Sequence, residues 1–130
     1  MDVVANMLTT ILNAQRVNKE RVALRYSKFK ESLARMLQER GLISAVRIQG
    51  EGAKAKLILT LAYENKEAKI QDLRRVSKPG LRRYADHSEL PYMGGRPGFF
   101  VVSTSQGLMD HEQARKEKVG GELICEVHIN

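Results

Sequence analysis

The chain has little of several residue types that mark other protein classes. Trp is absent, and aromatic residues make up only 5% of the 130 positions. The single cysteine, Cys125, cannot form an internal disulfide, so the fold must hold without one, as is usual in a reducing compartment. No stretch approaches the roughly 18 apolar residues of a membrane span, and the N-terminus lacks a signal-peptide pattern. We therefore expect a soluble protein of the cytosol or an organelle matrix, with no membrane partner.

Positive charge, in contrast, is in excess. The chain carries 22 Lys and Arg against 15 Asp and Glu, for a formal net charge of +7. Such a balance favours a polyanionic partner, with nucleic acid as the first candidate. The charge is also uneven, because residues 66–83 are strongly basic and residues 86–130 are net acidic. This division indicates that basic segments contact phosphates while a more neutral surface reads local structure.

The first half of the chain has the spacing of two helices and a hairpin. Ser27 is placed to cap the second helix, and Gly41 ends it in a left-handed conformation. A turn that starts at Gly50 joins two strands that follow. The predicted elements are a helix at 3–15, a strand at 21–26, a helix between Ser27 and Gly41, and strands at 43–49 and 56–63.

The second half reads as mainly β-structure with one short helix. Asp110, followed by Gln113 three residues later, resembles a capping box. The polar residues 64–67 mark a turn between two lobes, 1–64 and 65–130. The predicted elements are a strand at 69–76, a Pro-Gly turn at 79–80, an irregular stretch at 85–98, a buried strand at 99–102, a helix at 111–118 and a strand at 122–129. This order predicts an α+β fold of two small lobes, because strands adjacent in sequence pair without a crossover helix.

Three segments of the second half resemble a known family in order and spacing. They are RVSKPGLRRY at 75–84, VVSTSQGLM at 101–109 and VGGELIC at 119–125. The family is that of the bacterial-type small-subunit ribosomal protein number eight. Further matches to its opening helix and its next element are Asp2, Ala5, Met7, Leu8, Thr9, Ile11, Asn13, Ala14, Ser27, Lys28 and Lys30.

This resemblance implies a two-lobed α+β protein that binds a hairpin in the central domain of small-subunit rRNA early in assembly. Its other partners would be neighbouring small-subunit ribosomal proteins. Family members also often repress their own operon by binding an mRNA element that mimics the rRNA site, so the chain's own mRNA is a further candidate partner. We expect no cofactor, no catalytic role and a monomer when the protein is free.

The resemblance assigns RNA contacts to the Ser-Thr-Ser segment, Ser103, Thr104 and Ser105. Hydroxyls both donate and accept hydrogen bonds, so they suit base edges, 2′-hydroxyls and phosphates. Without the flanking motifs, an ordinary Ser/Thr-rich turn would be the simpler interpretation. Tyr84 is a candidate for stacking on a base or ribose, and the alternative for it is a half-buried core position.

The same resemblance extends to a glycine and several charged residues. Gly121 would let RNA approach the backbone, and the Glu122 carboxylate would accept a base amino hydrogen, although a plain turn also explains the Gly-Gly pair. Lys28 and Lys30 lie at a helix start, where cations and free N–H groups form an anion site. Lys78, Arg82 and Arg83 flank the Pro-Gly turn and are expected to meet phosphates, against the alternative of solvated surface charges.

The chain also departs from the family pattern in two places. Thr10 and Leu12 stand where arginines are common in the first helix, which weakens a role for that helix in gripping RNA by charge. The segment PYMGGRPGFF replaces a smoother Gly-rich approach to the following strand and leaves the path of residues 91–98 open, with Arg96 as a local contact candidate.

Enzyme and metal functions have little support in the sequence. The three histidines, His87, His111 and His128, lie in no recognisable catalytic motif. Cys125 and His128 are three residues apart on a predicted strand and so point to opposite faces, which argues against a shared metal. GGRPG precedes a strand and lacks a phosphate-loop lysine. Two alternatives stay open: a regulator that binds only mRNA, and a small basic nuclease.

Overall fold

The structure is a computed structural model that describes residues 2–130. It is an α+β fold, as predicted. The described chain divides into two compact units, residues 5–69 and residues 70–130 together with residues 2–4. Within these residues, none of the helices is both long enough and apolar enough to span a bilayer.

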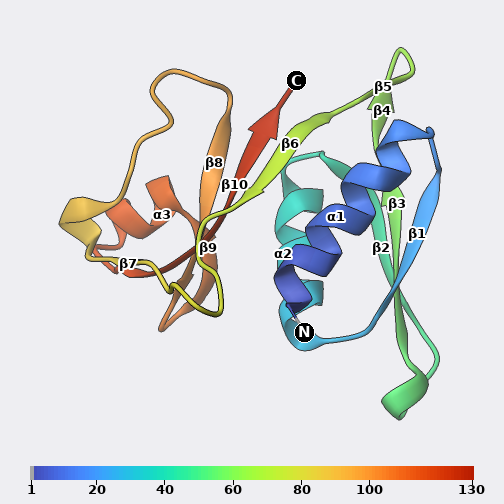
Figure 1. The fold of residues 1–130 in the computed structure, drawn as a ribbon, viewed down its shortest axis with the longest axis horizontal. Helices are drawn as coiled ribbons and strands as arrows, with labels where there is room; N and C mark the ends of the chain where they lie inside the picture. The colour runs from blue at the N-terminus through green and yellow to red at the C-terminus, as the bar shows by residue number, and fades with distance from the viewer. Residues whose placement is uncertain (1) are drawn as a thin grey trace. The chain divides into compact units, whose positions relative to one another are not determined.

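The first unit contains a three-stranded antiparallel sheet of order β1-β3-β2 and two helices that lie on one side of it (Figure 1). The β4 and β5 strands form a separate hairpin. The elements, beginning with the helix that enters this unit, are α1 (Val3–Arg16), β1 (Arg21–Arg25), α2 (Lys28–Glu39), β2 (Ile43–Gln49), η1 (Gly52–Lys54), β3 (Lys56–Leu61), β4 (Tyr63–Glu64) and β5 (Glu67–Ala68).

Local signals position these elements as predicted. The Ser27 hydroxyl caps α2 by accepting a hydrogen bond from the Lys30 backbone N–H at 3.1 Å. Gly41, with φ of +75°, ends the helix, and the following residue, Leu42, donates its N–H to the Leu37 carbonyl. In β3, alternate leucines are buried, so one face of the sheet packs on the helices and the other faces outward.

The second unit is built around its last strand. Strand β10 (Gly121–Ile129) is central in a sheet of order β6-β10-β8-β9, and β7 also pairs with it. All pairings are antiparallel. The other elements are β6 (Ile70–Arg75), β7 (Tyr84–Ala85), the short turn of helix η2 (His87–Glu89), β8 (Gly98–Thr104), β9 (Gly107–Asp110) and α3 (His111–Lys116).

Helix α3 packs over a small apolar cluster in this unit. Leu90, Val102 and Ala114 are its buried members. Asp110 caps the helix by accepting from the Gln113 N–H at 2.8 Å, as the predicted capping box requires of it. The Gln113 side chain instead donates to Glu117, so only half of the box forms. The helix ends at residue 116, two residues earlier than predicted.

Several short elements lie where the sequence analysis predicts none. Strands β7 and β9 add to the second sheet, and β4 and β5 pair around a turn at residues 65–66. The predicted lobe boundary after residue 64 falls within that hairpin. Strand β10 also shows a register shift against β8 between Leu123 and Cys125, so Ile124 and Cys125 are both buried and strict alternation fails there.

Candidate nucleic-acid interface

Sheet register brings three of the residues suggested by sequence into one row. Glu122 of β10 pairs with Ser103 of β8 on one side and with Tyr84 of β7 on the other. Residues directly opposite each other in antiparallel strands project from the same face. We call Tyr84, Glu122 and Ser103 the polar row. Its residues come from positions up to 38 apart in the chain, since 122 minus 84 is 38.

The hairpin tip between β8 and β9 continues the polar row. Thr104 pairs with Gly107, leaving Ser105 and Gln106 as the two turn residues. The Thr104 hydroxyl donates to the Gly107 carbonyl at 2.8 Å and accepts from the Gln106 N–H at 3.0 Å. Thr104 is thus occupied in shaping the turn, whereas Ser105 is exposed at its tip. Of the three predicted hydroxyls, those of Ser103 and Ser105 are the ones this turn leaves for a ligand.

The Glu122 carboxylate is held by two residues of the segment that precedes β7. Its Oε2 accepts from the Ser77 hydroxyl at 2.5 Å and from Arg82 Nη1 at 3.0 Å. The Ser77 oxygen in turn accepts from the Arg83 N–H at 3.1 Å. No described residue donates to the other carboxylate oxygen, Oε1. The network fixes the Pro-Gly turn against β10 and neutralises much of the carboxylate's charge.

Ser77 is the residue of this network that the sequence does not predict. It is only 2% exposed. Its sequence signal is a lone hydroxyl between Val76 and a basic turn, and nothing in local spacing shows that it is buried against a strand 45 residues away. Only the tertiary pairing of the segment with β10 reveals its role, through backbone bonds from Val76 and Ser77 to Ile124 and Leu123.

The structure gives the two consecutive glycines a packing reason. A Cβ at Gly121 would lie 2.0 Å from the Ser103 carbonyl oxygen, and one at Gly120 would lie 2.3 Å from the Ala85 oxygen. Neither separation is sterically possible. The missing side chains are therefore required by neighbouring strands of the same sheet, and this accounts for the glycines without any approach of RNA to the Gly121 backbone.

An exposed aromatic ring and basic side chains border the polar row. Tyr84 is 70% exposed, which excludes the half-buried alternative. Lys78, Arg82 and Arg83 are all exposed around the turn, where Lys78 and Leu81 form a two-residue bridge. Arg82 is engaged with Glu122, so Lys78 and Arg83 are the freer cations of the turn.

The two predicted lysines of the first unit have different environments. Lys28 is exposed at the start of α2. Lys30 is 7% exposed, and its ammonium group donates to the Arg25 carbonyl at 2.8 Å. Burial, with a smaller contribution from the Arg25 charge, lowers the pKa of Lys30. Lys30 is thus a structural lysine that joins α2 to β1, and only Lys28 keeps an ammonium free for an anion.

Two histidines and the cysteine of the second unit, His111, His128 and Cys125, are buried. His111 Nδ1 accepts from the Phe100 N–H at 3.0 Å. Burial raises the pKa of the Cys125 thiol from 9.0 to about 12. His128 is buried next to Glu126, at 3.3 Å between Nε2 and Oε1. Across residues 2–130 no group of at least three His, Cys, Asp or Glu is arranged to hold a metal ion.

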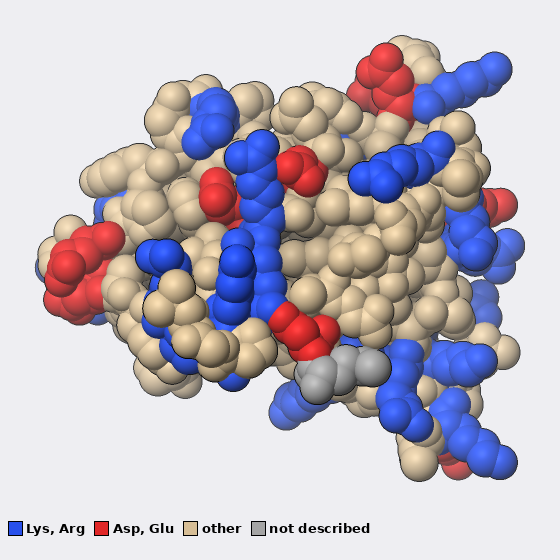
Figure 2. All heavy atoms as spheres, in the orientation of Figure 1, with Lys and Arg blue, Asp and Glu red and all other residues tan. Residues whose placement is uncertain are grey.

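Figure 2 shows Lys and Arg spread over the visible face, with Asp and Glu among them in the second unit. The blue side chains gather at the right edge and lower right, where strands of the first unit and η1 lie in Figure 1. Basic surface is therefore not confined to the turn beside the polar row.

Comparison with known proteins gives the same result over almost the whole chain. The family model described as ribosomal protein S8 matches residues 2–128. The small ribosomal subunit protein uS8 of Synechococcus sp. (strain JA-3-3Ab) is 44% identical over 98% of this chain and 96% of its own. That of Coxiella burnetii (strain RSA 331 / Henzerling II) is 43% identical, with 97% of each chain covered. The small ribosomal subunit protein uS8c of Welwitschia mirabilis is 40% identical over 98% of this chain and 99% of its own.

Proposed function

The chain belongs to the ribosomal protein S8 family, and on that premise we propose that it binds a hairpin in the central domain of small-subunit rRNA through the polar row and the adjoining hairpin tip. As a member of the family it is a structural constituent of the small ribosomal subunit and not an enzyme. Its partners are accordingly the small-subunit rRNA and neighbouring ribosomal proteins.

The observation that carries the proposal is the register of β10. It places Glu122 between Ser103 and Tyr84, so a hydroxyl, a carboxylate oxygen and an exposed ring share one face of a rigid sheet. Structured RNA is recognised through unpaired bases that stack on aromatic rings and through hydrogen bonds to base edges and 2′-hydroxyls. Sites carried on strands hold such groups more accurately than mobile loops do.

The basic turn supports the same proposal. Lys78 and Arg83 are exposed in the turn that is bonded to Glu122 of the polar row, so they supply phosphate contacts that position the RNA. Arg82 contributes in a different way, because its ion pair with Glu122 reduces the repulsion between that carboxylate and phosphates. Lys28 adds a phosphate contact from the first unit.

We also propose that binding occurs early in subunit assembly, with the protein acting as a monomer before it binds. An mRNA element that mimics the rRNA hairpin would use the same surface, because the polar row would contact the same local structure in either RNA. Sedimentation of the free protein and competition between the two RNAs test these points.

The experiment that tests the function is binding to the central-domain rRNA hairpin and to a scrambled hairpin of equal length, at low and at high salt. We expect tight binding to the native hairpin whose preference persists at high salt, because hydrogen bonds and stacking depend less on ionic strength than phosphate contacts do. Equal binding of both hairpins that vanishes with salt would overturn the proposal.

A single substitution then locates the contact. Ser105→Ala should weaken binding of the native hairpin by about 1–3 kcal/mol, because it removes a hydroxyl from a desolvated contact. Ser88→Ala is the matched control, since Ser88 is exposed in η2 and belongs to neither the polar row nor the hairpin tip. If both variants bind like the unmodified protein, Ser105 is not part of the interface.

A further inference from the structure

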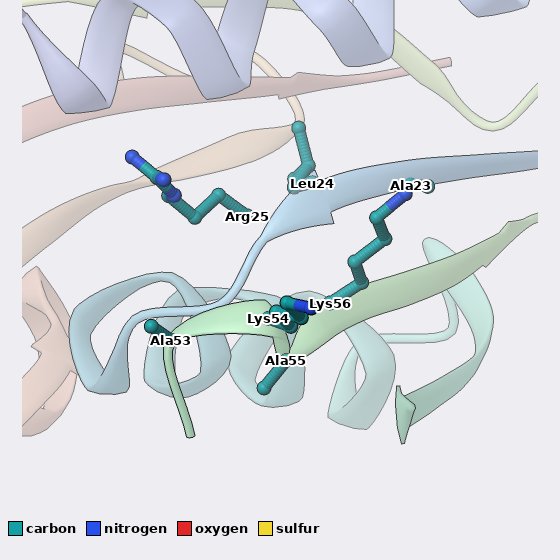
Figure 3. Close-up of a pocket in the computed structure, with 7 residues that line it drawn as sticks. All are labelled: Ala23, Leu24, Arg25, Ala53, Lys54, Ala55 and Lys56. Carbon is teal, nitrogen blue, oxygen red and sulfur yellow. The ribbon is translucent and has the colours of Figure 1, made fainter. Parts of the chain in front are cut away.

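The first unit contains a hollow of about 420 Å³ at the end of its sheet. We call it the basic hollow, and Figure 3 shows its lining residues. These come from the end of β1, from η1 and from the start of β3. They are Ala23, Leu24, Arg25, Ala53, Lys54, Ala55 and Lys56.

The cations of the basic hollow share the outward face of the sheet. Arg25 pairs with Lys56, so both side chains project from the same face, and Lys54 adds a third charge from η1. All three are exposed. Among the described residues, none forms an ion pair or hydrogen bond with the side-chain cation of any of the three; Lys30 contacts only the backbone carbonyl of Arg25.

The backbone around the basic hollow is tied in place. The Tyr26 N–H donates to the Ala55 carbonyl at 3.1 Å, which joins the end of β1 to the end of η1. The Ala55 N–H donates in turn to the Gly52 carbonyl at 3.2 Å. Gly50, with φ of +87°, makes the turn that leads into η1. The lysine and arginine stems therefore extend from a fixed frame.

No carboxylate lines the basic hollow. The nearest acidic residues in sequence are Glu51, which lies on the turn outside the lining, and Glu20, which pairs with Arg21. Three like charges without a counter-ion repel one another and make the site attractive to an anion. The lining also includes Ala23, Ala53 and Ala55, whose methyl groups add apolar surface that can contact a ribose or a base.

We propose that the basic hollow binds the phosphate and ribose of a single-stranded RNA segment distinct from the hairpin held by the polar row. The inference rests on the proposed function, because that function already makes RNA the polyanion to which the protein binds. Single strands bind where a positively charged groove tracks the phosphates and exposes surface to the sugar or base. The protein would then join two segments of RNA.

The test uses the full ¹⁵N-labelled chain saturated with the central-domain hairpin and then titrated with an oligouridine of roughly 6 nucleotides. We expect backbone amide shifts at Arg25, Lys54 and Ala55, whereas the amides of Ser103 and Ser105 report the hairpin. Hairpin binding without any oligouridine shifts in the first unit overturns this inference alone. Absence of the hairpin shifts overturns the proposed function instead.

Variants that remove charge distinguish binding at the basic hollow from general electrostatic attraction of RNA to a basic protein. Arg25→Gln, Lys54→Gln and Lys56→Gln together should lower the slope of log affinity against log salt by about 2 for the oligouridine, since each phosphate contact on a single strand contributes about 0.7. The control removes the same charge from exposed residues of the same unit outside the basic hollow, through Arg16→Gln, Lys19→Gln and Lys66→Gln. Equal effects of the two triple variants would overturn the proposal.

A single substitution tests the apolar lining of the basic hollow without changing its charge. Ala53→Phe places a phenyl ring in the basic hollow and should weaken oligouridine binding at least about tenfold if the ribose or base enters it, with thermal unfolding showing that the fold persists. A polyglutamate peptide of equal charge serves as the competing ligand. If it shifts the same amides with equal affinity, the hollow is an acidic-peptide site and the RNA assignment is wrong.

Discussion

The polar row and the basic hollow are two surfaces on separate units of one chain. They differ in whether their charged side chains form ion pairs and hydrogen bonds within the protein. In the polar row, the one carboxylate is bonded to Arg82 and Ser77, and the remaining groups are hydroxyls and an aromatic ring. In the basic hollow, three side-chain cations form no ion pair with any residue that the structure describes. The first surface suits recognition of RNA shape, which persists at high salt, and the second suits attraction of phosphate, which does not.

The largest effect is expected from a substitution that disrupts the backbone of β10, the strand that contains Glu122 of the polar row. Gly121→Ala should lower the free energy of unfolding by about 3 kcal/mol or more, because the new methyl group would overlap the Ser103 carbonyl in a close-packed sheet. Urea unfolding measures the loss. Gly80→Ala is the control, since nothing lies within 4 Å of a Cβ there, and similar stability of the two variants would contradict the packing argument.

The next test separates the two lysines of the first unit. Lys30→Gln should cost about 2 kcal/mol of stability, because the buried ammonium loses its bond to the Arg25 carbonyl, while the salt dependence of RNA binding stays unchanged. Lys28→Gln should do the reverse, lowering the salt slope by about 0.7–0.9 with no loss of stability. Denaturation curves and binding at several salt concentrations measure both. An unchanged stability for Lys30→Gln would mean that its ammonium is not structural.

A smaller change sharpens the account of the polar row. Ser77→Ala should lower the free energy of unfolding by about 1–2 kcal/mol, because the Arg83 N–H and the Glu122 carboxylate both lose a partner in a poorly solvated place. Hairpin affinity should fall with it, since Arg82 and Glu122 are no longer fixed. Oligouridine binding at the basic hollow should not change. A fall in both affinities would show that the two surfaces do not act independently.

The last prediction concerns pH and the buried thiol of Cys125 in strand β10. The folded-state pKa of Cys125 is raised from 9.0 to about 12, so the neutral thiol is favoured by folding. The stability is therefore fully present below pH 9.0 and declines as the pH rises toward 12. Near pH 10 the loss should be about 1 kcal/mol.

Measuring unfolding free energies near pH 8 and near pH 10 tests this expectation. The comparison is between the unmodified chain and Cys125→Ala, whose stability should decline less over that interval because no thiol ionises. Equal declines would mean that other groups cause the alkaline loss. The first unit contains no cysteine, so its stability should lack this contribution.

Elements with local signals could be predicted from the sequence. Ser27 caps α2 and Gly41 ends it because both act through their own backbone and nearest turn, which needs no partner strand. The alternating leucines of β3 and the apolar run in β8 likewise identify strands. Strands β7 and β9 could not be found in this way, because two to four residues carry no period and exist only by pairing with β10 and β8.

The sequence predicts which residues belong to the candidate site better than it predicts what each of them contacts. Family motifs singled out Tyr84, Ser103 and Glu122, and the register places them in one row. Their neighbours were not predictable, since Ser77 reaches Glu122 only when distant segments meet. Burial also decides between two identical lysines: the sequence treats Lys28 and Lys30 alike, and the helix turns one toward solvent and the other toward β1.

The ends of α2, the longer strands, the excess of positive charge and the α+β class can all be predicted from the residues, because each depends on neighbours within a few positions or on composition. The bond between Ser77 and Glu122, the lack of room for a side chain at Gly121 and the burial of Lys30 follow only from packing between segments of the folded chain. The physical reason is that strand register and burial come from contacts between segments far apart in the chain, and these contacts leave no periodic trace in the residues that make them.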